Sequence, residues 1–173
     1  MIFETERLIL RPWREDDAET LYKYASDERV GPPAGWKPHE SIEESLNVLR
    51  AVLMNENTWA VCEKGSDEPI GSIGIFDTDE NAENNWQIGY WLAVPFWGRG
   101  YIPEATKRLI AYCFEEQNAP SVWCSHAENN AKSRRVIEKC GFTYRFTKPW
   151  ESMLGDVRNS LYYSIDREDY LNE

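Results

Sequence analysis

Hydrophobic and polar positions follow two different periods along the chain, and these periods predict where helices and strands lie. Apolar residues recur every three to four positions after Asp16 and again after Ser41, which is the spacing of one buried helix face. Each of these residues can cap a helix and is followed three positions later by a glutamate, Glu19 or Glu44, as in a capping box. We therefore expect a helix to begin at each of these caps.

Shorter runs with a period of two, or with continuous apolar residues, predict the strands. The expected strands cover residues 8–11, 58–63, 70–76, 86–92, 121–126, 143–147 and 161–165. Two more helical patterns cover residues 102–116 and 131–140, whereas the prolines and glycines of residues 31–38 exclude regular structure there. The resulting order, β-α-α-β-β-β-α-β-α-β-β, predicts a mixed sheet flanked by helices in a single domain that spans residues 1–173.

The amino-acid composition agrees with one folded domain and favours a cytoplasmic protein. The chain has 173 residues, of which 42% are hydrophobic and 13% aromatic, and this argues against disorder. No apolar run approaches the roughly 20 residues of a membrane helix, and the first residues do not resemble a signal peptide. The four cysteines show neither a CxxC pair nor a Cys/His metal spacing. We expect a cytoplasmic protein without a metal or a membrane contact, whose cysteines are buried as small hydrophobic side chains.

Two glycines, Gly98 and Gly100, stand between the strand predicted at residues 86–92 and the helical pattern behind it. Glycines at such a junction let the backbone approach a ligand and aim consecutive N–H groups at it. The partial positive charge of the helix N-terminus favours a phosphate or pyrophosphate there. A plain tight turn is the alternative, because a short Gly-x-Gly is a weak signal by itself.

Charge adds a second constraint. The formal net charge of −11 argues against direct binding of nucleic acid, which needs a basic surface. It fits a cationic acceptor such as an amine or a basic peptide, although an acidic surface can also serve solubility alone. Several basic residues gather near the two glycines and near residues 130–135, where they could neutralise phosphate groups: Arg99, Lys107, Arg108, Lys132, Arg134 and Arg135.

Residues 97–105 (WGRGYIPEA) and 129–142 (NNAKSRRVIEKCGF) together resemble the two acetyl-CoA-binding motifs of the GNAT superfamily of N-acetyltransferases. Within it the chain is similar to the RimJ/RimL branch, named for enzymes that acetylate the N-termini of ribosomal proteins. The opening residues 5–12 (TERLILRP), the central strand 88–92 (IGYWL) and the last strand 160–165 (SLYYSI) also match this branch. The resemblance therefore runs nearly from end to end.

The resemblance implies an α/β (α+β) fold of the GNAT type, with a mixed, mostly antiparallel central sheet of about seven strands flanked by helices. It implies an acetyl-CoA-dependent N-acetyltransferase, with acetyl-CoA as cosubstrate and no metal. Backbone N–H groups at the edge of the central strand would polarise the thioester carbonyl. Matched to the motifs, the expected cofactor-binding residues are Leu92, Val94, Trp97, Gly98, Arg99, Gly100, Tyr101, Ile102, Asn130, Ser133 and Arg135.

Ser133 is the first of two expected catalytic residues. The resemblance places its hydroxyl near the sulfur of CoA, where it could assist the departing thiolate. The structural alternative is a serine one turn inside a helix that only faces solvent. Asn130, expected beside the pantetheine arm, would equally serve as the N-cap of the same helix.

His126 is the second expected catalytic residue. The branch often has a glutamate where this chain has Gln87, and a glutamine cannot accept a proton. We therefore expect His126, or a water that it holds, to accept the proton of the incoming amine. The alternative is a histidine satisfied by neighbouring polar groups, with water, Glu83 or Glu128 as the base.

The expected acceptor is a primary amine, with a protein or peptide N-terminus ahead of a small molecule. Direct attack in a ternary complex is expected, since no cysteine occupies an evident activating site. The alternatives are a polyamine or aminoglycoside acetyltransferase, and a non-catalytic acetyl-CoA-binding regulatory module. Acceptor recognition would rest on the 31–40 loop and the 77–85 connection, and the sequence is compatible with a monomer or a homodimer.

Overall fold

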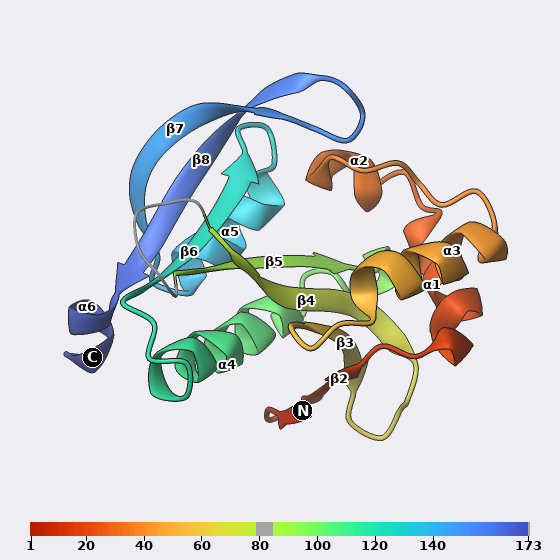
Figure 1. Ribbon diagram of the computed structural model, residues 1–173, viewed down its shortest axis with the longest axis horizontal. Helices are drawn as coiled ribbons and strands as arrows, with labels where there is room; N and C mark the ends of the chain where they lie inside the picture. The colour runs from red at the N-terminus through yellow and green to blue at the C-terminus, as the bar shows by residue number, and fades with distance from the viewer. Residues whose placement is uncertain (79–84, 173) are drawn as a thin grey trace.

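The computed structural model describes residues 1–78 and 85–172, and its centre is an eight-stranded sheet in the order β1-β2-β3-β4-β5-β6-β8-β7. All neighbouring strands are antiparallel except β5 and β6, which run parallel (Figure 1). The strands are β1 (Phe3–Glu4), β2 (Leu8–Pro12), β3 (Thr58–Glu63), β4 (Pro69–Asp77), β5 (Trp86–Leu92), β6 (Ser121–Ala127), β7 (Thr143–Glu151) and β8 (Val157–Asp166). The prediction of a mixed, mostly antiparallel sheet flanked by helices is confirmed.

Helices connect these strands and cover both faces of the sheet. They are η1 (Glu15–Asp17), α1 (Ala18–Ala25), α2 (Gly31–Ala34), α3 (Ile42–Val48), η2 (Leu49–Leu53), η3 (Val94–Phe96), α4 (Tyr101–Glu115), α5 (Ala131–Lys139) and α6 (Arg167–Leu171). Of these, η1 and η3 are 3-10 turns and η2 is a π-helical turn that continues α3. Within the described ranges, no helix combines the length and hydrophobicity that crossing a bilayer requires.

Strand β3 shows how the two layers are built, because its side chains alternate between two hydrophobic clusters. Trp59 and Val61 pack into the larger cluster, which includes the inner face of α4 and Ile137 of α5. Ala60 and Cys62 pack into the smaller cluster, with α1 and η2. Successive side chains of a strand point to opposite faces of its sheet. Helices α4 and α5 therefore lie on one face of the sheet, and α1 and η2 on the other.

The element bounds agree with the sequence pattern best at the centre of the sheet. Strands β3 and β5 begin and end at the predicted residues, α4 begins and ends one residue earlier than predicted, and α5 ends one residue earlier. The sheet has one strand more than the seven expected, because the two-residue strand β1 pairs with β2. The closing hairpin of β7 and β8 is also longer than the segments 143–147 and 161–165.

Two predictions about the N-terminal third are wrong. Asp16 does not cap the first helix, because the 3-10 turn η1 precedes α1. The carboxylate that accepts a backbone N–H at this turn belongs to Asp17. Asp17 is buried, so it needs partners, and it accepts the backbone N–H of Arg14 at 2.9 Å and the guanidinium of Arg11 at 2.8 Å. The turn therefore starts before Asp16. The second cap is confirmed, because the hydroxyl of Ser41 accepts the N–H of Glu44 at 3.0 Å.

Residues 31–38, expected to lack regular structure, contain the helical turn α2. Pro32 and Pro33 lie in its first turn, where a missing N–H costs nothing because that group has no helical partner. Gly35 ends the turn in the left-handed conformation, with φ at 90°.

All four cysteines are free and buried, as expected of small hydrophobic side chains. Burial raises the pKa of Cys62 and Cys140 to about 11 and the pKa of Cys113 and Cys124 to about 12. None of the four is therefore an activated nucleophile.

Candidate functional site

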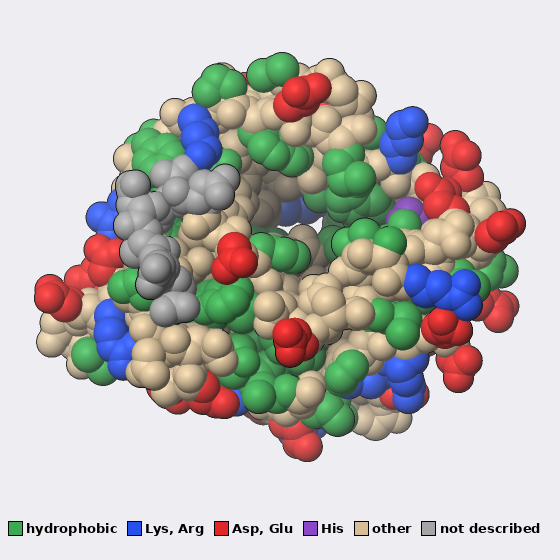
Figure 2. Space-filling view, viewed as in Figure 1, with side chains coloured by type: hydrophobic (Ala, Val, Ile, Leu, Met, Phe, Trp, Pro, Cys, Tyr) green, Lys and Arg blue, Asp and Glu red, His purple; other side chains and the backbone are tan. Residues whose placement is uncertain are grey.

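The parallel pairing of β5 with β6 extends over only three residue pairs, and the cleft begins where it stops. Trp86, Gln87 and Ile88 pair with residues 122–124 of β6. Beyond Ile88, β5 continues along β4 to Leu92, while β6 continues along β8 to Ala127. Beyond Ile88, one edge of β5 therefore has no neighbouring strand among the described residues. The space-filling view shows the surface hollowed between β5, β6 and α2 (Figure 2).

The chain leaves β5 through η3 and then forms the glycine turn that precedes α4. Gly98 and Gly100 both have left-handed backbones, with φ at 76° and 77°. A Cβ placed on Gly98 would meet no atom within 4 Å, so this side of the turn is open. Tyr101 and Ile102 are buried at the start of α4. The turn thus presents its backbone at a helix N-terminus, which is the geometry that suits a phosphate group.

Trp97 joins the glycine turn to both sides of the cleft. Its indole N–H donates to the carbonyl of Leu92 at 2.8 Å, which ties the turn to the end of β5. The ammonium of Lys132, on α5, lies over the ring of Trp97, 3.2 Å from the ring centroid. Burial, followed by the charge of Arg29, lowers the pKa of Lys132. Sequence reasoning counted Lys132 among the basic residues but did not foresee this contact.

The expected phosphate-binding arginines differ in their surroundings. Arg99 stacks over the ring of Phe96 and lies 3.6 Å from the carboxylate of Glu63, so its charge is partly engaged. Arg135 is exposed on α5 and forms no ion pair within the described residues. Val94 lies in η3, between the end of β5 and the glycine turn.

Helix α5 begins at the other side of the cleft, and its cap and first turn carry two of the expected site residues. The side chain of Asn130 accepts the N–H of Ser133 at 3.2 Å, so the capping role is real. The hydroxyl of Ser133 lies 2.8 Å from that of Tyr90, on the part of β5 that has left β6. Burial raises the pKa of Tyr90 well above its ordinary value. Tyr90 is therefore neutral and can donate a hydrogen bond to Ser133.

His126 is buried on β6, and both of its ring nitrogens have partners. Nδ1 lies 2.8 Å from the carbonyl oxygen of Ala127, and Nε2 lies 3.2 Å from the hydroxyl of Tyr163. Gln87 donates instead to the hydroxyl of Ser125 at 2.9 Å. Since Ser125 and His126 are consecutive on a strand, their side chains point to opposite faces. This geometry favours the structural role of His126 that the sequence left open.

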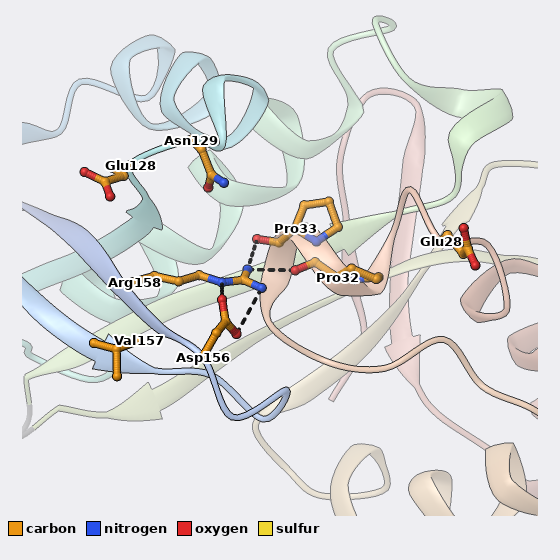
Figure 3. A pocket seen from close by; sticks show the side chains of 8 residues that line it. All are labelled: Glu28, Pro32, Pro33, Glu128, Asn129, Asp156, Val157 and Arg158. Carbon is orange, nitrogen blue, oxygen red and sulfur yellow. Dashed lines mark hydrogen bonds and ion pairs between the residues drawn. The ribbon is translucent and has the colours of Figure 1, made fainter.

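The described residues add a cavity that sequence reasoning did not assemble. It has a volume of about 540 Å³ and lies between α2, the start of α5 and the hairpin of β7 and β8 (Figure 3). Its lining residues are Glu28, Pro32, Pro33, Glu128, Asn129, Asp156, Val157 and Arg158. Of the two segments expected to recognise the acceptor, the 31–40 loop contributes to this cavity. Most of the 77–85 connection, with Glu83, lies outside the described residues.

Arg158 closes one side of this cavity. Its guanidinium is held by the carboxylate of Asp156 at 2.6 Å and donates to the carbonyl of Pro32 at 2.7 Å. The hairpin also donates the N–H of Met153 to the carbonyl of Gly35 at 2.9 Å. These bonds join the hairpin of β7 and β8 to the α2 turn, more than a hundred residues away in sequence. No local pattern could have predicted them.

The cleft fits acetyl-CoA in its chemistry. The open glycine turn suits a pyrophosphate, and the free edge of β5 offers hydrogen-bonding groups to an amide-containing arm. Within residues 1–78 and 85–172, no group of three or more histidine, cysteine, aspartate or glutamate side chains is arranged to hold a metal ion.

Comparison with known proteins gives consistent results. The relative named "Uncharacterized N-acetyltransferase p20", from Bacillus licheniformis, is 26% identical over 172 residues and covers 96% of each chain. "Putative ribosomal N-acetyltransferase YdaF", from Bacillus subtilis, is 40% identical over 104 residues, which are 60% of this chain and 56% of that protein.

Solved structures share the fold over nearly the whole chain. A GNAT-family acetyltransferase from Bacillus anthracis has a TM-score of 0.83 at 24% identity, covering 97% of this chain and 99% of that one. A structure described as a putative ribosomal-protein-serine acetyltransferase from Vibrio cholerae has a TM-score of 0.81 at 22% identity, covering 96% and 97%.

The family match spans most of the residues discussed above. Residues 7–143 match the family described as "Acetyltransferase (GNAT) domain", and they include the glycine turn, the diverging strands and the start of α5. The chain therefore belongs to the GNAT acetyltransferase family, whose members use acetyl-CoA as the acetyl donor.

Proposed function

We propose that this acetyltransferase transfers the acetyl group to the N-terminal amine of a protein or peptide, by direct attack in a ternary complex in the cytoplasm. The observation that carries the proposal is the acidic cavity beside Asn129, which adjoins the start of α5. Asp156 is paired with Arg158, whereas Glu28 and Glu128 form no ion pair within the described residues. The cavity can therefore attract a cationic chain end.

The names of two similar proteins support a protein acceptor. The Bacillus subtilis relative is named as a putative ribosomal N-acetyltransferase, and the Vibrio cholerae structure as a putative ribosomal-protein-serine acetyltransferase. Together with the similarity to the RimJ/RimL branch, these names favour a protein N-terminus over other amines.

Bound acetyl-CoA would supply a thioester, and residues of this chain would hold it in place. In the proposed arrangement, backbone N–H groups of residues 98–102 bind the pyrophosphate, with Arg135 as counter-charge, and Asn130 lies beside the pantetheine arm. At the end of β5, the backbone N–H groups of Leu92 and Val94 would point toward the thioester carbonyl, whereas the Ala93 N–H donates to the carbonyl of Ile70 at 2.8 Å. The hydroxyl of Ser133, held by Tyr90, donates a hydrogen bond that stabilises the departing thiolate, which then takes its proton from water.

The acceptor must lose a proton, and an α-amine needs little help to do so. Its ordinary pKa is about 7.7–8.0, against about 10.4 for a lysine. Gln87 cannot accept a proton, and both ring nitrogens of His126 are engaged. The proton then passes to water or to the carboxylate of Glu128, which lines the cavity. Such weak bases suit an α-amine better than a lysine.

A small polyamine or aminoglycoside is the second candidate acceptor. The carboxylates of Glu28 and Glu128 in one cavity are the observation that favours it, because a polycation can contact both.

The acceptor proposal is tested with a matched panel of amines. We expect a basic peptide with a free α-amine to give kcat/KM at least about tenfold above the same peptide with a blocked N-terminus and one lysine, because of the lower pKa of its amine. Release of CoA is measured for both peptides, for spermidine and for an aminoglycoside. Preference for spermidine or the aminoglycoside would support the second candidate instead.

The proposed cofactor site is tested at two glycines with similar backbones. In the wild type, acetyl-CoA at about 100 times its Kd should stabilise the fold by about 2.7 kcal/mol and raise Tm by several degrees. Gly98→Asp should remove this rise, because it puts a carboxylate where the phosphate binds. Gly65→Asp is the control, since Gly65 also has a positive φ and no atom within 4 Å of an added Cβ. Equal rises in Tm for both variants would exclude the site.

The role of Ser133 is tested by separating chemistry from binding. Ser133→Ala should lower the single-turnover rate by about 10²-fold, the lower end of the loss expected when one hydrogen-bond donor to the transition state is removed. The Kd of acetyl-CoA should change less than about twofold, because the interaction strengthens only as the thiolate forms. An unchanged single-turnover rate would leave Ser133 as a helix residue without a part in catalysis.

The role of His126 is tested by the pH profile of kcat/KM. We expect His126→Gln to keep the acidic limb of the wild type, since the limb then reports the pKa of the acceptor amine. Replacing an α-amine acceptor by a lysine acceptor should move that limb up by about 2.5 pH units. Loss of the limb in the variant would identify His126 as the base, as first expected from the sequence.

A further inference from the structure

The opening motif at residues 5–8 contacts the start of α4, although it lies nearly a hundred residues away in sequence. The carboxylate of Glu104, in the first turn of α4, accepts the backbone N–H of Arg7 at 2.8 Å and the Arg7 Nε–H at 2.7 Å. The hydroxyl of Thr5 donates to the same carboxylate. Burial alone would raise the pKa of Glu104, but the hydrogen bonds from Thr5 and Arg7 outweigh it and lower the pKa. Glu104 is therefore ionised at neutral pH.

Arg7 also contacts the glycine turn itself. Its Nη1–H donates to the carbonyl oxygen of Arg99 at 2.9 Å. Its guanidinium lies over the ring of Tyr101, 4.8 Å from the centroid, and Nη2 lies 3.5 Å from where a Cβ on Gly100 would stand. One side chain thus contacts Arg99 and Tyr101 and lies beside Gly100, which stands between them.

The bond to the Arg99 carbonyl determines where the next N–H group points. The carbonyl of Arg99 and the N–H of Gly100 belong to one planar trans peptide, so they point in opposite directions. With the carbonyl held by Arg7, the Gly100 N–H points to the other face of the turn. The orientation of this peptide depends on ψ of Arg99 and φ of Gly100, and Gly100 tolerates either sign of φ, so the local sequence alone does not select it.

We propose that Arg7 is a positioning residue for the pyrophosphate-binding turn, acting with Glu104 to aim the Gly100 N–H at the phosphate. This inference rests on the placement of acetyl-CoA at residues 98–102 in the proposed function. The positive charge of Arg7 is neutralised by Glu104, so its contribution is orientation of the peptide more than attraction of the anion.

The Glu104→Gln variant distinguishes a positioning role from a purely electrostatic one, because the two predict opposite changes in the affinity for CoA. Removal of a carboxylate near an anionic ligand should strengthen binding if only charge matters. The amide NH₂ of glutamine, however, cannot accept the Arg7 Nε–H, so the orientation of Arg7 would be lost. The proposal therefore expects weaker CoA binding in Glu104→Gln and in Arg7→Met, by about five- to tenfold in Kd.

The experiment measures the Kd of CoA by calorimetry and the Kd of pantetheine, which lacks the pyrophosphate, by NMR titration. In Arg7→Met and Glu104→Gln, CoA should bind more weakly while the Kd of pantetheine changes less than about twofold. Arg50→Met is the matched control, because it breaks an exposed arginine–glutamate pair between η1 and η2, with Arg50 2.7 Å from Glu15. Its Kd values should equal those of the wild type.

The contrary results distinguish failure of the positioning role from failure of the proposed cofactor site. Unchanged CoA binding in Arg7→Met, tighter binding in Glu104→Gln, or an equal loss for CoA and pantetheine would each overturn the positioning role. Failure of the wild type to bind CoA would overturn the proposed site, and the inference with it. None of these measurements includes an acceptor substrate, so their results do not depend on which amine the enzyme acetylates.

Discussion

The divergence of β5 from β6 is the constraint on which the site depends. Parallel pairing lasts for three residue pairs, after which β5 keeps only β4 as its neighbour and β6 keeps only β8. β6 is held by seven residue pairs with β8, and β5 by seven pairs with β4, so both remain strands without each other. The backbone groups on the free edge of β5 need partners, and a ligand rich in amides and carbonyls can supply them. The sheet is thus stable on both sides of the space between β5 and β6, and this space stays open for a ligand.

The same divergence brings two helix N-termini to the cleft. Each diverging strand is followed by a helix, with α4 after β5 and α5 after β6. The glycine turn and the Asn130 cap therefore lie at the ends of the strands that separate, one on each side. Trp97 and Lys132 connect these two sides, since one lies beside the glycine turn and the other in the first turn of α5. Positive partial charge thus converges from both sides.

The sequence could predict those parts of the fold and site that depend on local chemistry. Glycines with positive φ at residues 98 and 100, the Ser41 and Asn130 caps, and the full length of β5 all have signals within a few residues. Features that depend on distant partners could not be predicted. Asp17 is drawn into its turn by Arg11, and Arg158 reaches Pro32 across the fold. One partner of His126, the hydroxyl of Tyr163, likewise comes from a strand far along the chain. Strand β1 has two residues, too few for a periodic pattern.

The burial of the cysteines has a practical consequence for anyone who handles this enzyme. With thiol pKa values of about 11 to 12, their thiolate fraction near pH 8 is of the order of one in a thousand or less. A disulfide reagent added to the folded protein therefore reacts with free CoA far faster than with the chain. All four thiols are free and buried in the native fold, so unfolding exposes them. The same reagent thus reports turnover in the native enzyme and, by a sudden rise in its signal, the loss of the native fold.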